Sequence, residues 1–259
     1  MSIQGFEDWL QTPPGQYVLR WERARHDLLV ADIFGFNALQ LSLPRIDFLR
    51  MNRMPLHIRC DDGCFTGKSE VCSDLHFLPF AANSIDLVVL PHTLEFDQNP
   101  HQVLREVERV LVPEGHVIVT GFNPYSLWGL RRRLFRRQSL PPWRGQYISE
   151  SRLKDWFSLL GFEILTGRYG CHAPAMTQEK WLRRLKFMDV AGDKWWPIVG
   201  AVYVIQAVKR QHGMRLITPA WADRKARAKA LVTVTQIHDG PLTKMSGLNH
   251  DTVADIVAD

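Results

Sequence analysis

The sequence has few cysteines and no long apolar run. Four cysteines in 259 residues, and a start that carries Glu7 and Asp8 in place of an apolar signal region, indicate a protein of a reducing compartment. The longest apolar stretch, residues 198–208, is shorter than the roughly 20 residues that cross a bilayer as a helix. We therefore expect a soluble, cytoplasmic protein without a transmembrane segment.

A strong charge imbalance and internal repeats are also absent. The net charge of +5 allows an anionic partner but does not by itself indicate one. With 46% apolar residues, a chain of this length can bury one substantial core with appendages. We therefore expect a single α/β domain.

The pattern that organises the chain lies between Asp74 and Pro124. Residues 85–90 form a short apolar run, as expected of a strand that is covered on both faces. Asn99 can cap a helix whose apolar residues fall on one stripe, and the proline and glycine within residues 113–115 end that helix. The next strand, residues 116–120, completes a strand–helix–strand unit, which implies a right-handed crossover in a parallel sheet.

Weaker patterns extend this arrangement on both sides. Apolar residues from Tyr17 to Ala31 recur at helical spacing after a Pro-Pro-Gly breaker at residues 13–15, which predicts an amphipathic covering helix. Ser149 can cap another helix, which stops at Gly161. The remaining expectations are short helices at 45–53 and around 181–188, and strands at 38–43, 56–60, 70–73, 162–165 and 198–208.

Three motifs in the central segment belong together. They read D-L-H-F-L-P-F from Asp74, S-I-D-L-V-V from Ser84 and R-E-V-E-R-V-L-V-P-E-G from Arg105. In this order they resemble the type 11 group of class I S-adenosylmethionine-dependent methyltransferases, and the likeness extends more loosely over residues 38–210. It implies a Rossmann-like α/β fold with a mostly parallel seven-stranded sheet, helices on both faces and an antiparallel last strand, with S-adenosylmethionine at the carboxyl ends of the strands.

The resemblance also implies which residues bind the cofactor. In the family, the acid that ends the second strand holds the ribose hydroxyls, and Asp61 is its candidate. The acid that ends the third strand accepts from the adenine amino group, which indicates Asp74, and the amide of Leu75 would meet an adenine ring nitrogen. The loop after the fourth strand, here Pro91 and His92, would lie beside the methionine part.

The sequence departs from the family in the loop after the first strand. The family has a glycine-rich loop there, because a side chain would collide with the methionyl part of the cofactor. This chain has Ser-Leu-Pro at residues 42–44, and Gln40 where an acid is usual. We therefore expect a degenerate cofactor loop at Ser42. The short interval between Asp61 and Asp74 predicts a shortened second crossover.

The resemblance requires no particular catalytic residue, because methyl transfer depends mainly on the alignment of the nucleophile with the sulfonium. His92 is a candidate base, with a packed loop histidine as the alternative. Asn123 begins an N-P-Y tripeptide similar to the N-P-P-Y signature of amino-group methyltransferases, although that signature belongs after the fourth strand and this tripeptide follows the fifth. We expect the methyl acceptor to approach these two residues and the segment Arg131 to Arg137.

The segment at residues 125–147 interleaves arginines with apolar and aromatic residues. Trp128, Arg131, Arg132 and Arg133 are its candidate contacts for a substrate or partner. A solvated helix face above buried tryptophans explains the same pattern. Alternatively, the segment binds an anionic substrate, a membrane surface or RNA, and these alternatives stay open.

Cys60, Cys64 and Cys72, with His57 or His76, raise the question of a zinc site. The spacing of the cysteines has no matching second pair, as zinc sites usually have. Small apolar cysteines in adjacent strands explain the spacing better, and we expect no metal.

These patterns divide the chain into three parts. Residues 1–36 form an N-terminal helical cover, residues 37–210 form the methyltransferase-like domain with a basic aromatic insertion at 125–147, and residues 211–259 form a flexible basic tail. The leading hypothesis is a methyltransferase that uses S-adenosylmethionine and has an unidentified acceptor. Its rival is a non-catalytic protein of the same fold that binds RNA, membrane lipid or a protein through the segment Arg131 to Arg137.

Overall fold

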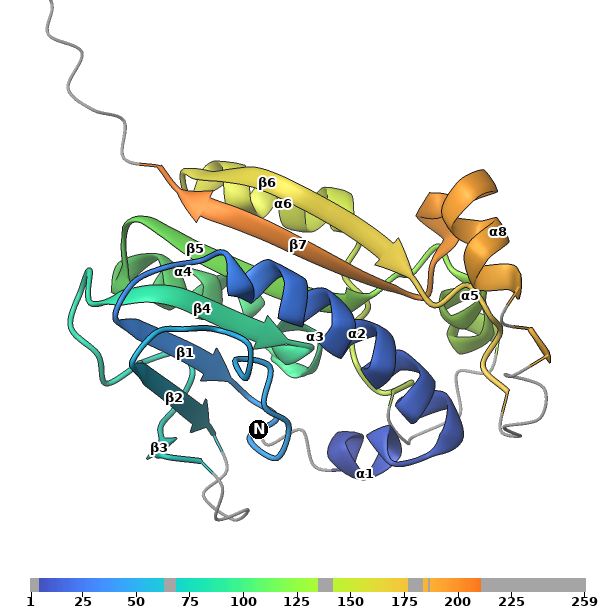
Figure 1. Ribbon diagram of the computed structural model, residues 1–259, viewed down its shortest axis with the longest axis horizontal. Helices are drawn as coiled ribbons and strands as arrows, with labels where there is room; N and C mark the ends of the chain where they lie inside the picture. Colours follow the sequence, from blue (N-terminus) through green and yellow to red (C-terminus); the bar gives the residue numbers. More distant parts are fainter. Residues whose placement is uncertain (1–4, 63–68, 135–141, 177–183, 186, 211–259) are drawn as a thin grey trace, which may run out of the picture. The chain divides into compact units, whose positions relative to one another are not determined.

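A seven-stranded sheet forms the centre of the computed structural model, which describes residues 5–62, 69–134, 142–176, 184–185 and 187–210 (Figure 1). The strand order is β3-β2-β1-β4-β5-β7-β6, with β1 to β5 parallel to one another and β7 antiparallel to β5 and β6. The predicted sheet is therefore confirmed. The strands are β1 (Asn37–Leu41), β2 (Leu56–Asp61), β3 (Val71–Cys72), β4 (Ile85–Pro91), β5 (Leu111–Phe122), β6 (Phe162–Gly170) and β7 (Val202–Lys209).

Helices cover both faces of the sheet, and alternate residues of the strands serve two cores. In β4, Val88 and Leu90 share a core with α4 and α6, whereas Leu87 and Val89 share the other core with α1 and α2. Figure 1 shows α2 crossing one face, with α4 and α6 behind the other. The helices are α1 (Phe6–Leu10), α2 (Pro13–Ala31), α3 (Thr93–Phe96), α4 (Pro100–Val110), α5 (Leu127–Leu134), α6 (Glu150–Leu159), α8 (Phe187–Trp195) and the 3-10 helix η2 (Pro197–Val199).

The long helix α2 begins earlier than predicted. Thr12 is its N-cap, and the Thr12 hydroxyl accepts a hydrogen bond from the amide of Gly15 at 3.4 Å. Pro13 occupies the first turn, where a missing N–H costs nothing, so residues 13–15 start the helix and do not precede it as a breaker. A Cβ on Gly15 would lie 2.2 Å from the carbonyl oxygen of Trp9, so α1 packs directly on this glycine.

The two other predicted helix starts are correct. The helix α4 begins at Pro100, although the Asn99 side chain makes no capping bond and contributes only its carbonyl. The helix α6 has the predicted cap, because the Ser149 hydroxyl accepts from the amide of Arg152 at 3.3 Å. Gly161 follows that helix with φ of 78°, a left-handed conformation that glycine adopts without strain.

The prediction of a helix at residues 45–53 is wrong. Residues 42–55, which connect β1 to β2, form turns. The Asp47 carboxylate accepts from the amide of Leu49 at 2.9 Å, a local bond of the kind that competes with helix formation. The connection from β2 to β3 spans only residues 62–70, in agreement with a shortened second crossover.

Other boundaries differ by a few residues. Residues 197–199 form η2, so β7 starts at Val202 and not at residue 198, whereas β6 continues five residues beyond the predicted end to Gly170. The predicted helix around 181–188 corresponds in part to α8, although residues 181–183 lie outside the described ones. The chain divides into two units, residues 1–212 and 213–259. The tail prediction for 211–259 and part of the 125–147 insertion lie outside the described residues, and the domain boundaries stay predictions.

In the described part of the chain, every helix is too short or too polar to span a membrane.

Candidate functional site

Two connections meet at the carboxyl ends of the central parallel strands. The amide of Ser42, directly after β1, donates to the carbonyl of Cys60 in β2 at 2.8 Å. The hydroxyl of Thr93, at the start of α3, donates to the carbonyl of Leu41 in β1 at 2.9 Å. These bonds hold the loops after β1 and β4 beside each other and beside the end of β2, at the edge where ligands bind in open α/β sheets.

The loop after β1 has the backbone of a glycine turn without its glycines. Ser42 has φ of 70° and Leu43 has φ of 51°, both in the left-handed region that favours glycine. Both side chains are buried, and Leu43 lies in the same core as Phe6 of α1. The chain therefore maintains a strained turn at the predicted cofactor loop and fills it with side chains.

Gln40 holds this turn closed from inside the core. Its Nε2 atom lies within hydrogen-bonding distance of the carbonyls of Ser42, Leu43 and Ile46, at 3.1, 3.1 and 2.8 Å. Its Oε1 atom accepts from the amide of Phe48 at 3.0 Å. A buried carboxylate at this position cannot donate to those carbonyls, which explains why an amide replaces the usual acid here.

Asp61 ends β2 and is only 5% exposed. The helix α1 lies close to it, because Glu7 forms an ion pair with Arg45 at 3.1 Å in the loop after β1. Burial raises the pKa of the Glu7 carboxyl, Arg45 opposes that rise, and the negative charge of Asp61 adds to it. Asp61 thus lies at the end of β2, beside a second acidic group from α1, and its role as the ribose acid stays a prediction.

Asp74 follows β3 and projects into solvent with an exposed carboxylate. Its Oδ1 atom accepts from the amide of His76 at 2.9 Å and lies 2.6 Å from Nδ1 of the same residue. These bonds lower the pKa of the Asp74 carboxyl, the backbone bond most. Burial tends to lower the pKa of His76, but Asp74 and Asp97 raise it. Asp74 is therefore an oriented, ionised acceptor, and the adjacent Leu75 has a buried side chain.

His92 is completely buried after β4, which ends at the buried Pro91. Its Nδ1 atom lies 2.7 Å from Glu95 in α3, and its Nε2 atom lies 2.5 Å from Glu22 in α2. The residue has φ of 55°, a conformation that costs energy outside glycine and that surrounding bonds must impose. Two carboxylates from helices on either side of the loop impose it here.

The two carboxylates set the charge of His92. Burial lowers the pKa of the imidazole, but Glu22 and Glu95 outweigh burial and raise it to about 10. Burial also raises the pKa of Glu95, against the opposing effect of His92. One helical turn after Glu22, burial lowers the pKa of His26 to about 3, and the positive charge of His92 adds to that effect. The loop after β4 therefore contains an imidazolium at neutral pH.

Glu95 also explains a glycine in β5. Its Oε1 atom accepts from the amide of Phe122. A Cβ on Gly121 would lie 2.7 Å from the Tyr203 hydroxyl and 3.2 Å from Glu95 Oε1, so only glycine leaves room for both neighbours.

Asn123 is buried just beyond β5, and its side chain makes structural hydrogen bonds. Its Nδ2 atom donates to the carbonyls of Ile198 and Gly200 at 2.7 and 3.0 Å, and its Oδ1 atom accepts from the amide of Tyr125 at 3.0 Å. These bonds join the start of α5 to η2. Contact of the Asn123 side chain with an acceptor stays a prediction, and it would replace some of these bonds.

The described part of the basic aromatic insertion at residues 125–147, called the basic segment below, is anchored by its aromatic and arginine side chains. Trp128 is buried and donates to the carbonyl of Ala173 at 2.9 Å, and Arg131 donates to the carbonyl of Ala175 at 2.6 Å. Arg132 donates to the Trp143 carbonyl at 2.9 Å. Arg133 is exposed. The reading of a solvated helix above buried tryptophans fits these contacts, and a role of the arginines with a substrate stays a prediction.

An aromatic cluster connects the basic segment to His92. The rings of Trp128 and Phe122 lie 5.9 Å apart, those of Phe122 and His92 4.5 Å apart, and Phe6 of α1 contacts both Phe122 and His92. Trp9 of α1 contacts Trp128. The structure thus brings together Trp128 and His92 through α1, whereas Asp74 lies at the exposed β3 end of the site.

S-adenosylmethionine fits the nucleoside end of this site. Asp74 offers an ionised, exposed acceptor to an amino group, and Asp61 offers a carboxylate at a strand end. These are the hydrogen-bond acceptors that the adenine amino group and the ribose hydroxyls need. The loop that would face the methionyl end has the required turn at Ser42 and Leu43, but α1 contacts it through Glu7 and Arg45.

The sequence patterns do not reveal the charged partners that set the pKa and orientation of these histidines. Glu95 lies one helical turn after His92, so its spacing was a usable signal. Glu22 lies 70 residues away in sequence and gave none. Asp97, which orients His76, was equally hidden, although its bond from the amide of Asn99 is a turn contact typical of an aspartate.

The cysteines and histidines do not form a metal centre in the described part of the chain, where no group of three or more potential ligand residues is placed to hold a metal ion. Cys60 and Cys171 are buried free thiols, whereas Cys72 is exposed and disulfide-bonded. The prediction of small apolar cysteines in adjacent strands therefore holds for Cys60 and is wrong for Cys72. Burial raises the pKa of the Cys60 thiol to about 12, with Asp61 adding to the rise, so this thiol is protonated at neutral pH.

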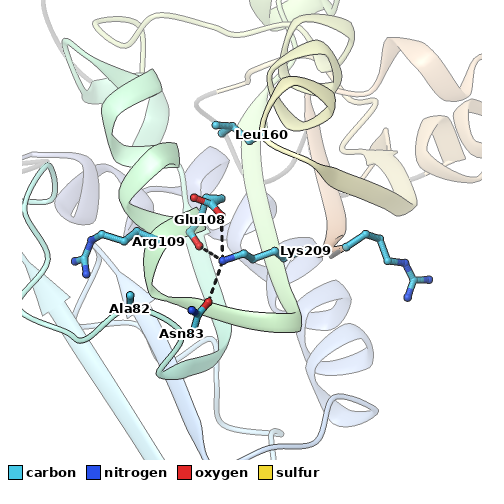
Figure 2. A pocket seen from close by; sticks show the side chains of 7 residues that line it. Ala82, Asn83, Glu108, Arg109, Leu160 and Lys209 are labelled. Carbon is cyan, nitrogen blue, oxygen red and sulfur yellow. Dashed lines mark hydrogen bonds and ion pairs between the residues drawn. The ribbon is translucent and has the colours of Figure 1, made fainter. Parts of the chain in front are cut away.

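A separate cavity of about 480 Å³ lies at the opposite end of the strands, between the start of β4 and the end of β7 (Figure 2). Lys209 crosses it and donates to the Asn83 side chain at 3.2 Å and to the carbonyls of Glu108 and Leu111 at 2.6 and 2.9 Å. Its Nζ atom also lies 3.0 Å from the Glu108 carboxylate. Lys209 therefore ties β7 to the end of α4, and the cavity lies away from the candidate site.

The central segment of the chain matches a known sequence family. The family described as "Methyltransferase domain" matches residues 51–119. "Uncharacterized protein YafS" of Escherichia coli is 41% identical over 96 residues, which cover 37% of this chain and 40% of that protein. A malonyl-[acyl-carrier protein] O-methyltransferase of Methylovorus is 37% identical over 128 residues, 49% of this chain and 39% of that enzyme. The chain thus matches less than half the length of these relatives.

Comparison with solved structures extends the likeness to the whole sheet. A chain from the complex between the Haloferax volcanii Trm112 methyltransferase activator and a methyltransferase has a TM-score of 0.56 at 13% identity, covering 83% of this chain and 100% of that one. A SAM-dependent methyltransferase of Archaeoglobus fulgidus has a TM-score of 0.53 at 16% identity, covering 74% and 94%. The resemblance to class I S-adenosylmethionine-dependent methyltransferases is confirmed, in sequence over the central segment and in fold over the sheet.

Proposed function

We propose that the protein is an S-adenosylmethionine-dependent methyltransferase. The observation that carries the proposal is the placement of Asp61 and Asp74 at the carboxyl ends of β2 and β3, in a sheet with the strand order of the class I enzymes. The match of residues 51–119 to the methyltransferase domain supports it, because this segment includes both acids.

Each residue of the candidate site has a proposed role. Asp61 holds the ribose hydroxyls, and Asp74, oriented by His76, accepts from the adenine amino group. The backbone of Leu75 meets the adenine ring. Ser42 and the main chain of Pro91 and His92 flank the methionine part. When bound, S-adenosylmethionine supplies a methyl group on a positively charged sulfur.

The role of the protein in methyl transfer is to align an acceptor with the cofactor and to exclude water. We place the acceptor on the side of His92, Asn123 and the basic segment. The His92 ring is an imidazolium with both nitrogens bound to carboxylates, so it orients the loop in this state. It becomes a base only if one of those bonds opens and the proton is lost.

Binding of the cofactor tests this proposal without knowledge of the acceptor. Isothermal titration calorimetry of the full chain with S-adenosylmethionine and with S-adenosylhomocysteine should give saturable heat, whereas ATP, which shares the adenosine but lacks the amino acid part, should bind more weakly. No heat and no thermal shift at millimolar concentrations of either ligand would contradict the proposal.

The location of the protein is also a proposal. We place it in the cytoplasm, as the few cysteines of the sequence indicate. The disulfide bond of Cys72 is the observation that argues against this placement. Cell fractionation, with a thiol-alkylation assay of the redox state of Cys72 in intact cells, tests this placement, and a protein found outside the cytoplasmic fraction would contradict it.

A further inference from the structure

Exposed apolar side chains gather on two neighbouring elements, α5 and the α8–η2 segment. Leu130 and Leu134 of α5, with Phe187, Trp195, Trp196 and Ile198 of the other segment, are between 52% and 73% exposed. We call these six residues the α5–α8 patch. Asn123, which lies between β5 and α5, donates to the carbonyls of Ile198 and Gly200. Both helices also bind residues 172–173, since Trp128 of α5 donates to the carbonyl of Ala173 and Asp189 of α8 accepts from the amide of His172. An exposed apolar group of this size indicates a surface that is covered in function.

The charge beside the patch is predominantly positive. The described residues of 125–134 and 184–200 contain five cations, namely Arg131, Arg132, Arg133, Arg184 and Lys194, against the acids Asp189 and Asp193. Asp189 is turned to the interior, where it accepts from the Tyr17 hydroxyl and from the amide of His172 at 2.9 Å. The partner of this surface is therefore expected to be anionic.

The composition of the patch favours a lipid surface over RNA. Tryptophan prefers the interface between lipid headgroups and acyl chains, and aliphatic residues enter the acyl region below it. RNA is bound through stacking aromatics and cations, to which Leu130, Leu134 and Ile198 add nothing. Arg131 and Arg132 are held in place by the carbonyls of Ala175 and Trp143, so the cations beside the patch are partly ordered in advance.

We infer that the α5–α8 patch docks the protein on a membrane surface that carries anionic lipids. The patch lies at the edge where β6 ends and β7 begins, the same edge as the carboxyl ends of β1, β4 and β5. Docking through it therefore places the candidate site next to the lipid headgroups. The inference does not depend on methyl transfer, because it rests on the exposed side chains and their charge.

Vesicle co-sedimentation of the full chain tests the inference. The protein should sediment with vesicles of phosphatidylcholine and phosphatidylglycerol and should remain in solution with phosphatidylcholine alone. Added salt should weaken the binding, since screened charges attract less. The variant W195S/W196S should bind anionic vesicles at least about tenfold more weakly. The variant R133S/K194S should bind roughly thirtyfold more weakly, given about 1 kcal/mol for each of the two cations near such a surface.

Matched controls distinguish binding through the patch from binding through any exposed aromatic or charged residue. The variant F34S/F36S removes two aromatic side chains of equal exposure from the loop before β1, and R105S removes an exposed cation from α4. Both should bind vesicles like the wild type. Thermal melting checks that each variant is folded, and titration with S-adenosylmethionine shows that W195S/W196S retains the cofactor affinity of the wild type.

Three results would overturn the inference. They are failure of the wild type to bind anionic vesicles, equal binding by W195S/W196S and the wild type, and equal losses in the patch and control variants. The second result would assign lipid binding to cations elsewhere in the chain. Failure of cofactor binding with intact vesicle binding would contradict the proposed function alone.

Discussion

The Nε2 atom of His92 and the Oε1 atom of Glu22 lie 2.5 Å apart in a fully buried position. Glu22 belongs to α2, before the first strand, and His92 follows the fourth, so this contact ties the N-terminal helix to the predicted cofactor edge of the sheet. Glu95 binds the other ring nitrogen. The His92 loop is thus held in its left-handed conformation from both sides.

Replacement of Glu22 by alanine should destabilise the fold strongly. Removal of one partner from a buried ion pair typically costs about 3–5 kcal/mol, because the other charge remains buried. Asp27→Ala is a matched control on the same helix, since Asp27 pairs with the largely exposed Arg50, a pair worth about 1 kcal/mol or less. Urea unfolding measures both values. A Glu22→Ala variant no less stable than Asp27→Ala would contradict this role.

Stability should fall as pH rises above neutrality. The pKa of His92 is raised from 6.5 to about 10 in the folded state, so between these values the folded chain binds a proton that the unfolded chain has lost. The contribution of His92 is complete below pH 6.5 and disappears as pH passes 10, with a slope of at most about 1.4 kcal/mol per pH unit. Urea midpoints measured through this range should show the slope in the wild type and a shallower one in His92→Gln. Equal slopes would argue against a charged His92.

The opposite slope should appear on the acid side. The pKa of His26 is lowered from 6.5 to about 3, so the unfolded chain binds a proton between these values that the folded chain does not. This contribution is complete above pH 6.5 and is lost as pH falls toward 3. Between pH 6.5 and 5, where most carboxylates remain ionised, His26→Gln should flatten the decline. An unchanged decline would mean that other groups cause it.

Ser42→Gly should stabilise the protein. Ser42 has φ of 70°, where a residue with a Cβ is disfavoured by roughly 1 kcal/mol relative to glycine. Ser151→Gly in α6 is a control of opposite sign, because glycine in a helix costs about 0.5 kcal/mol relative to serine. Thermal unfolding compares the two. A loss of stability in Ser42→Gly would show that the buried hydroxyl contributes more than the strained turn costs.

The fold was predictable where local patterns and global arrangement agree. The apolar run of β4 and the apolar stripe of α4 each bury a face that periodicity reveals, and the D-L-H-F-L-P-F and R-E-V-E-R-V-L motifs determine their order in the sheet. The false helix at residues 45–53 shows the limit. There the side chain of Gln40, outside the segment, binds the carbonyl of Ile46 and the amide of Phe48, and no local pattern indicates these contacts.

The candidate site was predictable only in part, for a related reason. Strand ends can be located from sequence, so Asp61 and Asp74 could be named together with their edge of the sheet. The state of His92 depends on Glu22, which only the packing of α2 brings near. The exposed residues of α8 and η2 were likewise hidden, because a run of tryptophan and isoleucine after a helix is as typical of a core as of a surface.

The affinity of the Asp74→Ala variant for S-adenosylhomocysteine is the most direct test of the cofactor site. Asp74 is exposed, so its removal should leave the fold intact while it removes an acceptor of the adenine amino group. Calorimetry should show a dissociation constant at least about tenfold higher than that of the wild type, since a hydrogen bond to a charged group contributes about 1.5–3 kcal/mol. Asp155→Ala, an exposed acid on α6, should bind like the wild type. Equal affinities in all three proteins, or no binding by any of them, would contradict a cofactor site at Asp74.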